Sequence, residues 1–262
     1  MRLKSEKTDT VVIVTRHDSH ARQVVSALQA GKNVFCEKPL CLTEEELLTI
    51  EKLARERSDL RVMVGFNRRF SPLVVKAKAL LDTVMQPKSL IMTVNAGEIP
   101  PDHWTQDRAV GGGRIIGEGC HFIDLLRYLI GHPIVESSAF TQADQSRAQP
   151  LDDKTTIVLR FADGSVGTVH YLANGHKGFP KERLEAFCGG KVLQLDNFRK
   201  LKGWGWKGFK RLSLWRQDKG QTACAKSFID AIKEGNSSPI PLEEIIEVTR
   251  TSIEVAEKAY QQ

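Results

Sequence analysis

The sequence lacks the features that mark several classes of protein. No apolar run approaches the length of a membrane span, and the first ten residues, MRLKSEKTDT, hold no apolar stretch of the kind found in a secretory signal. The cysteines show no paired metal-binding spacing, so we expect no metal site and buried, reduced thiols. They are Cys36, Cys41, Cys120, Cys188 and Cys224. These absences favour a cytoplasmic protein without a membrane partner.

The charge of the chain is mildly basic. Its 262 residues carry a formal net charge of +6, and the isoelectric point is about 9.1. This excess fits anionic ligands such as nucleotides, although it is also common in proteins where it serves only solubility. The one basic-aromatic stretch, RKLKGWGWKGFKR at residues 199–211, matches no nucleic-acid motif. We therefore expect no nucleic-acid partner.

The first third of the chain alternates between strand and helix patterns. Apolar, β-branched runs predict strands at 9–15, 33–39 and 61–66, and amphipathic patterns predict helices at 20–31, 43–57 and 71–81. Thr43 with Glu46 forms a capping box, while Ser71 as N-cap precedes Pro72 at the first helical position. This alternation indicates a parallel, doubly wound sheet. We assign residues 1–86 to a partial Rossmann-like, dinucleotide-binding domain.

The pattern changes near residue 87. A strand at 89–97 and a long polar loop lead to a helix at 118–131, and two helices are predicted at 222–234 and 241–259. Hairpin signals at Ala162-Asp163-Gly164 and Gly189-Gly190 separate strand-like runs. These runs cover residues 134–142, 154–161, 165–172, 183–190, 191–197 and 211–216. We assign residues 87–262 to an α+β domain with an open antiparallel sheet covered by helices on one face.

An acid, a base and a proline follow the second predicted strand. In an open parallel sheet, ligands bind at the carboxyl ends of the strands, where Glu37 and Lys38 lie. Pro39 keeps Lys38 out of the helical region, so the two side chains point to opposite sides. One can then reach a cofactor while the other reaches a substrate. The alternative is a surface ion pair in a loop.

Several motifs together resemble one enzyme family. They are VVIVTRHDSH at 11–20, GFNRRFSP at 65–72, GGGRIIGEGCHFIDLLRYLIG at 111–131 and SFIDAIKEGNSSPIPLEEIIEVTR at 227–250. With Glu-Lys-Pro, their order and spacing resemble the glucose–fructose oxidoreductase/inositol dehydrogenase (Gfo/Idh/MocA) family over nearly the whole chain. The stretch NAGEIPPDHWTQD at 95–107 resembles modules of this family that are fused to zinc-type dehydrogenases.

The resemblance implies an oxidoreductase that uses NAD or NADP. Such an enzyme transfers hydride to or from a hydroxyl or ketone of a sugar, cyclitol or nucleotide sugar. The family lysine corresponds to Lys38, which would touch the nicotinamide ribose and stabilise alkoxide charge on the reacting oxygen. The family's helix histidine corresponds to His121, a candidate proton donor or acceptor. A histidine bonded in the domain interface is the alternative for His121.

Further candidates lie close to these residues in the predicted fold. For the cofactor we expect contacts from Thr15, Arg16, His17, His20, Glu37 and Lys38. For the substrate we expect contacts from Asn67, Arg68, His103, Trp104 and Glu118. The structural alternatives are surface charge at a helix start for residues 67–69 and loop packing for His103 and Trp104.

The chain departs from the family pattern at two places. Many members have an aspartate four residues before the histidine, where this chain has Gly117. Glu118 lies about 100° round the helix from that position, but could orient His121 at i,i+3 spacing. Asp124, at the same spacing, is expected to cap or pair structurally.

The second departure concerns the pyrophosphate-binding turn. No GxGxxG turn lies between a predicted strand and a predicted helix, so we expect a family member that lacks the first half of its Rossmann domain, and cofactor binding could be lost. The alternative function is a non-catalytic relative that binds a ligand or partner without turnover. Self-association is expected through the second sheet, as the resemblance implies, or through strand 10–15, which would become an unprotected sheet edge. The alternatives for this edge are cover by residues 1–8, or poor order with marginal solubility.

Overall fold

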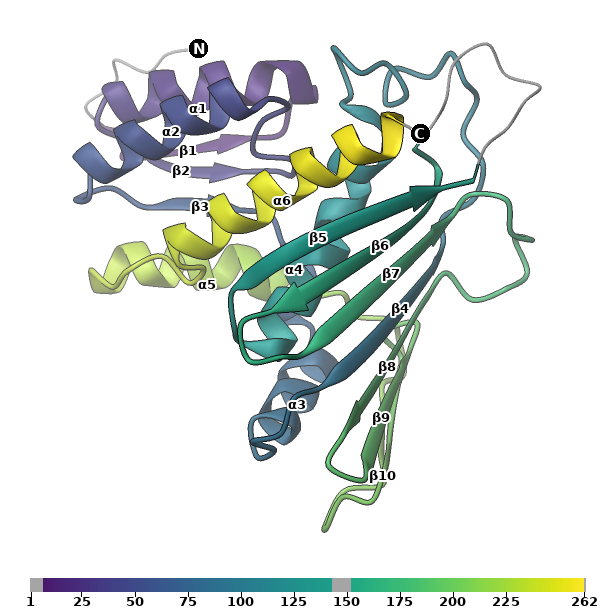
Figure 1. The fold of residues 1–262 in the computed structure, drawn as a ribbon. Coiled ribbons are helices and arrows are strands. Elements are labelled where there is room, and N and C mark those ends of the chain that lie inside the picture. Colours follow the sequence, from purple (N-terminus) through teal and green to yellow (C-terminus); the bar gives the residue numbers. More distant parts are fainter. Residues whose placement is uncertain (1–6, 143–151, 262) are drawn as a thin grey trace.

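The chain folds around two sheets that lie side by side and are crossed by one long helix (Figure 1). The computed structural model describes residues 7–142 and 152–261. The smaller sheet has the order β1-β2-β3, and both strand pairs run parallel. Its elements are β1 (Thr10–Ile13), α1 (His20–Gln29), β2 (Asn33–Cys36), α2 (Glu44–Glu56), β3 (Val62–Val64) and α3 (Pro72–Leu81). The predicted parallel, Rossmann-like sheet is confirmed.

Helices cover both faces of this sheet at its centre. Every residue of β2 is buried, as expected for a strand that reads as a continuous apolar run. Helices α1 and α2 lie on one face and α5 (Gln221–Glu234) on the other (Figure 1). The rings of Phe35 in β2 and Phe228 in α5 are 5.6 Å apart. Helix α5, which lies near the end of the chain, therefore completes the core around the sheet formed by the first residues.

The predicted helix starts are confirmed in position and differ in detail. Thr43 Oγ1 accepts a hydrogen bond from the backbone N–H of Glu46, but the Glu46 carboxylate accepts from the N–H of Leu42. Ser71 is the N-cap of α3, yet its hydroxyl donates to the carbonyl of Asp218 at 2.7 Å and not to the helix. Proline at the first position removes one N–H that would otherwise need a partner, which leaves Ser71 available for this tertiary contact.

The larger sheet has the order β11-β10-β9-β8-β4-β7-β6-β5. Its strands are β4 (Ser89–Asn95), β5 (Ile134–Thr141), β6 (Lys154–Phe161), β7 (Val166–Leu172), β8 (Glu182–Cys188), β9 (Lys191–Asp196), β10 (Lys200–Trp204) and β11 (Arg211–Ser213). All pairs are antiparallel except β4 with β7, which are parallel. The sheet is thus mixed where an antiparallel sheet was expected, because the connection from β4 to β7 includes a helix and a hairpin and can reverse direction.

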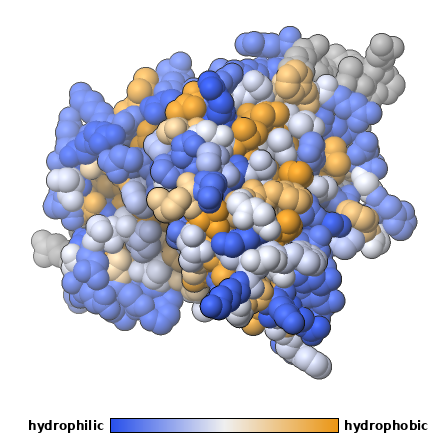
Figure 2. Space-filling model, turned by 60° about the horizontal axis from the view of Figure 1, so that its bottom comes forward, coloured by the Kyte–Doolittle hydropathy of each residue, from blue (hydrophilic) through white to orange (hydrophobic). Residues whose placement is uncertain are grey.

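One face of the larger sheet is covered and the other is open. Helix α4 (Cys120–Ile130) lies behind the sheet (Figure 1), and its Phe122 ring is 6.4 Å from the ring of Tyr171 in β7. Burial alternates along β4, as expected when one face meets solvent. Apolar side chains on the open face include Ile91, Phe140, Val166, Phe187 and Trp204. The face of the molecule drawn in Figure 2 shows hydrophobic residues interspersed with hydrophilic ones.

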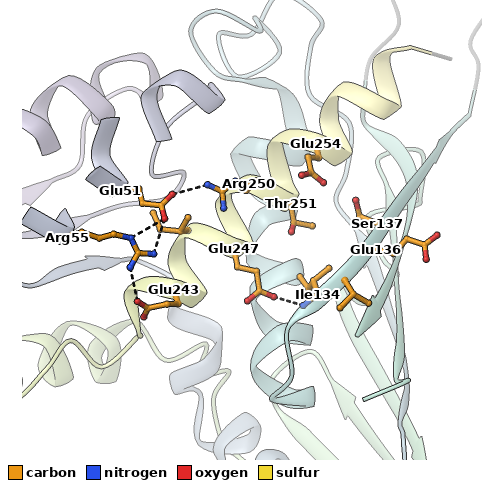
Figure 3. Close-up of a pocket in the computed structure, with 12 residues that line it drawn as sticks. Glu51, Arg55, Ile134, Glu136, Ser137, Glu243, Glu247, Arg250, Thr251 and Glu254 are labelled. Atoms are coloured by element: carbon orange, nitrogen blue, oxygen red, sulfur yellow. Dashed lines mark hydrogen bonds and ion pairs between the residues drawn. The ribbon is translucent and has the colours of Figure 1, made fainter. Parts of the chain in front are cut away.

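Helix α6 (Leu242–Tyr260) ties the two sheets together. Arg250 reaches α2, where it pairs with Glu44 and Glu51, each at 2.9 Å. Farther along, Lys258 Nζ donates to the Ser137 carbonyl of β5 at 2.8 Å. Figure 3 shows the polar groove between these elements, a cavity of about 330 Å³ with the Arg250–Glu51 contact at one side. No helix among the described residues has both the length and the apolar character needed to span a membrane.

Candidate functional site

A cavity of about 280 Å³ lies where the ends of the small sheet meet the second half of the chain. Each strand of that sheet is followed by one lining residue: His17 after β1, Lys38 after β2 and Arg68 after β3. This is the edge at which open parallel sheets bind ligands. The remaining lining residues are Ile99, Trp104, Thr105, Gly113, Arg114, Gly117, Glu118 and His121.

Glu37 and Lys38 reach different segments, as their alternation predicts. Lys38 Nζ donates a short hydrogen bond to the carbonyl of Gly117. The Glu37 carboxylate lies against the end of β3, where a Cβ added to Gly65 would be only 2.9 Å from Oε2. Glycine at 65 therefore makes room for Glu37, and only Lys38 lines the cavity.

His121 lines the same cavity as Lys38. It is the second residue of α4 and is 6% exposed, and its Nδ1 has no hydrogen-bond partner among the described residues. Burial, followed by the charges of Arg68 and Lys38, lowers the pKa of His121 well below 6.5. The imidazole is therefore neutral at physiological pH and can accept a proton or a hydrogen bond.

Glu118 does not orient His121, which corrects one expectation. Its carboxylate accepts from the Tyr171 hydroxyl at 2.6 Å, from Lys181 at 2.8 Å and from Arg114 at 3.1 Å. Burial alone would raise the pKa of Glu118, but Lys181 and the other donors lower it to about 2. Residues 115–119 form a π-helical turn before α4, so regular i,i+3 geometry does not apply there.

His17 is held at the cavity by the glycine-rich turn and by Trp104. Its Nδ1 lies 2.8 Å from the carbonyl of Gly111, and its ring meets Trp104 edge-on at 4.8 Å. Burial is the main reason why the pKa of His17 falls from 6.5 to about 4. Arg16 lies over the Trp104 ring at 5.7 Å. The indole thus joins the first strand end to the loop that follows β4.

Two expected cofactor contacts take part in local structure. His20 is fully buried, with Nδ1 2.6 Å from the carbonyl of Pro39 and Nε2 3.0 Å from the carbonyl of Thr15. It holds the two strand ends together and does not line the cavity. The Thr15 hydroxyl lies 2.7 Å from the hydroxyl of Ser19, so it stabilises the start of the first helix.

Of the expected substrate contacts, some line the cavity and others make hydrogen bonds elsewhere in the fold. Arg68 and Trp104 line the cavity, whereas Asn67 donates to the carbonyl of Lys219 at 2.6 Å and does not line it. His103 is exposed, and its Nδ1 lies 2.8 Å from the Thr105 hydroxyl. The side chains of Asn67 and His103 therefore make structural hydrogen bonds within the fold and, contrary to expectation, do not line the cavity.

The neighbouring arginines each pair with a buried carboxylate. Arg68 donates to Glu182 through Nη2 at 2.8 Å and Nε at 3.3 Å. Arg69 contacts both carboxylate oxygens of Asp124, which confirms the structural role expected for Asp124. Of these two arginines, Arg68 lines the cavity and Arg69 does not.

The wall and its surroundings also contain charged residues that were not predicted from the sequence. Arg114 lines the cavity, with Nε bonded to the Tyr171 hydroxyl at 2.8 Å. Lys181 and Glu182 lie at the start of β8, and Lys219 pairs with Glu182 at 2.8 Å. Arg114 could have been noticed beside the glycine run at 111–113, but the others carry no local signal because their partners lie far away in the chain.

Two family models match the chain. The model described as "Oxidoreductase family, NAD-binding Rossmann fold" matches residues 2–66. The model described as "GFO/IDH/MocA C-terminal domain" matches residues 86–190. Both halves thus point to one family.

The chain is also similar to curated enzymes. It is 32% identical to inositol 2-dehydrogenase 2 of Saccharopolyspora erythraea over 177 residues, which is 66% of this chain and 50% of that protein. It is 27% identical to myo-inositol 2-dehydrogenase of Thermotoga maritima over 205 residues, 75% of this chain and 59% of that protein. The chain therefore spans between 50% and 59% of the length of these relatives.

A solved structure shares the fold. Levoglucosan dehydrogenase in complex with NADH and levoglucosan superposes with a TM-score of 0.84 at 23% identity, covering 99% of this chain and 80% of that chain. At this identity the likeness shows the fold alone, a parallel Rossmann-like sheet beside a mixed one.

Proposed function

Because this chain belongs to the Gfo/Idh/MocA family of oxidoreductases, we propose that it acts in hydride transfer between NAD or NADP and a sugar or cyclitol carbon. One observation carries the proposal: Lys38 and the neutral, buried His121 line the same cavity at the strand ends. The similar curated proteins are dehydrogenases, which favours an enzyme over the alternative of a non-catalytic relative. We further propose the domain boundaries 1–86 and 87–262, and self-association through the open face of the large sheet.

The residues at the strand ends fit the nicotinamide end of such a cofactor. His121 has a buried Nδ1 without a partner among the described residues, and Lys38 reaches the same cavity. We expect Arg16, His17 and Lys38 to contact the cofactor and Arg68, Trp104 and Glu118 to contact the substrate. Bound NAD(P) would supply the group that accepts or gives the hydride.

The chain's own residues manage the proton and the developing charge. When a substrate hydroxyl is oxidised, its oxygen loses a proton and carries alkoxide character. The Lys38 ammonium stabilises this negative charge, because its bond to the Gly117 carbonyl leaves further N–H donors. Neutral His121 accepts the proton. Ile99 and Trp104 add apolar surface to the cavity wall.

Cofactor titration and turnover test this proposal. We expect NAD(H) or NADP(H) to bind the purified protein in calorimetry or by a change in tryptophan fluorescence. Reduced cofactor should then form with myo-inositol or levoglucosan, and Lys38→Ala should abolish this signal. Lys52→Ala, in an exposed side chain of α2, is the matched control. Absence of binding at millimolar concentrations of all four cofactor forms would refute the oxidoreductase proposal.

A further inference from the structure

The charged side chains around the cavity point to a more specific ligand. We propose that the preferred substrate is a sugar acid, a polyol that carries a carboxylate group, over a neutral sugar or cyclitol. This inference rests on the proposed function, because it places the carboxylate beside a hydroxyl that is oxidised in the same cavity.

Cations outnumber carboxylates in and around the cavity wall. The wall contains Lys38, Arg68 and Arg114 but only one acidic residue, Glu118. Lys181 and Lys219 extend the cationic set, and Glu182 supplies a second carboxylate. Lys38 and these two groups of ion-paired residues together contain five cationic side chains against two carboxylates.

Each of these carboxylates is shared between two cations. Glu182 accepts from both Arg68 and Lys219 at 2.8 Å, while its side chain is fully buried. Glu118 accepts from Arg114 and Lys181. One negative charge cannot neutralise two positive ones, so each group keeps an excess of one positive charge.

The contacts of Lys38 and Asp152 do not remove this excess of positive charge. Lys38 donates to the uncharged carbonyl of Gly117. The carboxylate of Asp152 lies near the glycine-rich turn, where it accepts from the backbone N–H groups of Arg114 and Ile115 at 2.7 and 2.8 Å. Even with Asp152 counted, cations stay in excess. In a partly buried site this excess favours an anionic ligand.

The position of the cations favours the substrate over the cofactor as the source of the anion. Arg114, Lys181 and Lys219 come from the second half of the chain, whereas the expected cofactor contacts lie at residues 15–20 and 37–38. Buried His121 lines the same cavity wall as Lys38, Arg68 and Arg114, and the charges of Arg68, Lys38, Lys219 and Lys181 lower the pKa of its imidazole after burial. Its unpartnered Nδ1 independently indicates a ligand that completes the hydrogen bonding.

The reaction leaves the carboxylate unchanged. A secondary alcohol carbon of the sugar acid loses a hydride to NAD(P)⁺, and the hydroxyl oxygen loses its proton to the chain. The C–H and O–H bonds break, the carbon–oxygen double bond forms, and the products are a keto acid and NAD(P)H. The carboxylate serves only to hold and orient the substrate.

Matched acid and neutral ligands test the charge preference. With saturating cofactor, D-glucuronate is compared with D-glucose and D-gluconate with D-sorbitol, by calorimetry and by NAD(P)H formation. We expect each acid to bind at least about tenfold more tightly than its neutral partner, with an affinity that falls as salt concentration rises. Neutral ligands binding as tightly as the acids overturn the inference while the oxidoreductase proposal stands. Acids that bind selectively without forming NAD(P)H support the ligand class and refute the oxidoreductase proposal.

A variant of Lys181 separates the two possible sources of the anion. Lys181 is 42% exposed at its side chain, so Lys181→Gln removes one cation without opening the core. We expect it to weaken binding of the acids about tenfold. Lys202→Gln, in an exposed position of β10, should leave acid binding unchanged. If Lys181→Gln weakens only NADH and NADPH, the cations serve the cofactor phosphates and the inference is wrong.

Discussion

Glu182 offers the sharpest test of the electrostatics around the cavity. Glu182→Gln keeps the shape of the side chain and removes its charge. In the native chain the fully buried carboxylate accepts from Arg68 and Lys219, each at 2.8 Å. A neutral amide in its place would leave both cations without a counter-ion in a buried position. The expected result is a large loss of stability that acts through charge and not through packing.

The size of the loss follows from the burial of the three groups. Removing one partner of a buried ion pair costs roughly 3–5 kcal/mol. The Lys219 side chain is 17% exposed and retains some solvation, so we expect the lower end, about 3 kcal/mol. For a chain of this size that corresponds to a fall in Tm of roughly 6–12 °C. Glu185→Gln on the same strand is the control, because its partner Arg183 is 46% exposed and such pairs contribute less than about 1 kcal/mol.

Circular dichroism during thermal and urea unfolding measures both variants. Glu182→Gln should also be stabilised selectively by sulfate or gluconate, because an anion can replace the missing charge. Burial alone would raise the pKa of Glu182, but Arg68 and Lys219 hold it below 4.5. The stability from this pair is therefore present above pH 4.5 and is lost as the pH falls further. A loss below about 1 kcal/mol for Glu182→Gln, or an equal loss for Glu185→Gln, would refute this reasoning.

Three further predictions concern Lys38, His17 and Val12. Lys38→Ala should lower turnover at least about 100-fold with an unchanged circular dichroism spectrum, and unchanged turnover would exclude a catalytic role. Because His17 has a pKa of about 4 in the folded chain against 6.5 unfolded, stability should fall by roughly 2–3 kcal/mol as the pH drops from 6.5 to 4. In urea titrations His17→Gln should reduce this slope, and an unchanged slope contradicts the assignment. Val12 is 58% exposed in β1, a strand that pairs only with β2 among the described residues, so Val12→Lys should weaken self-association in sedimentation velocity. Identical sedimentation of both proteins would count against a role for this edge.

The exposed edge of β1 was predicted from the sequence, but one alternative outcome involves residues outside the described part of the chain. Val12 and Val14 are exposed on and just after β1, as expected for an edge without lysine or proline. The alternative in which residues 1–8 cover the strand involves residues 1–6, which lie outside the described part of the chain.

Sequence patterns predicted best those structural features that depend on residues adjacent in the chain. The apolar run of β2 and the Thr43 cap of α2 depend on a few adjacent positions, and both lie where expected. β10 was missed because its Gly203 and the adjacent Gly205 are typical of loops. The parallel pairing of β4 with β7 was also missed, since it depends on the path of the intervening chain and not on either strand.

The polar residues of the site show why residue roles are harder to predict than elements. Glu118 was expected to face His121, but its partners Tyr171 and Lys181 are 53 and 63 residues away in the chain. A carboxylate turns to the strongest donors that the fold brings near it, and no local pattern reports them. The same reasoning applies to Asn67, whose partner is the carbonyl of Lys219, 152 residues away.

Gly117 connects these observations to the chemistry. The family resemblance leads one to expect an aspartate there, yet a Cβ at this position would lie 3.3 Å from His17 Cε1, a tight contact that would require a small shift of His17. Lys38 instead donates to the backbone carbonyl of Gly117. A carbonyl carries no net charge, so Lys38 keeps its full positive charge toward the cavity and contributes to the low pKa of His121. Replacing the expected carboxylate by glycine thus leaves a neutral histidine in a cationic cavity, where the positive charges suit an anionic substrate and the imidazole can accept a hydrogen bond from its hydroxyl.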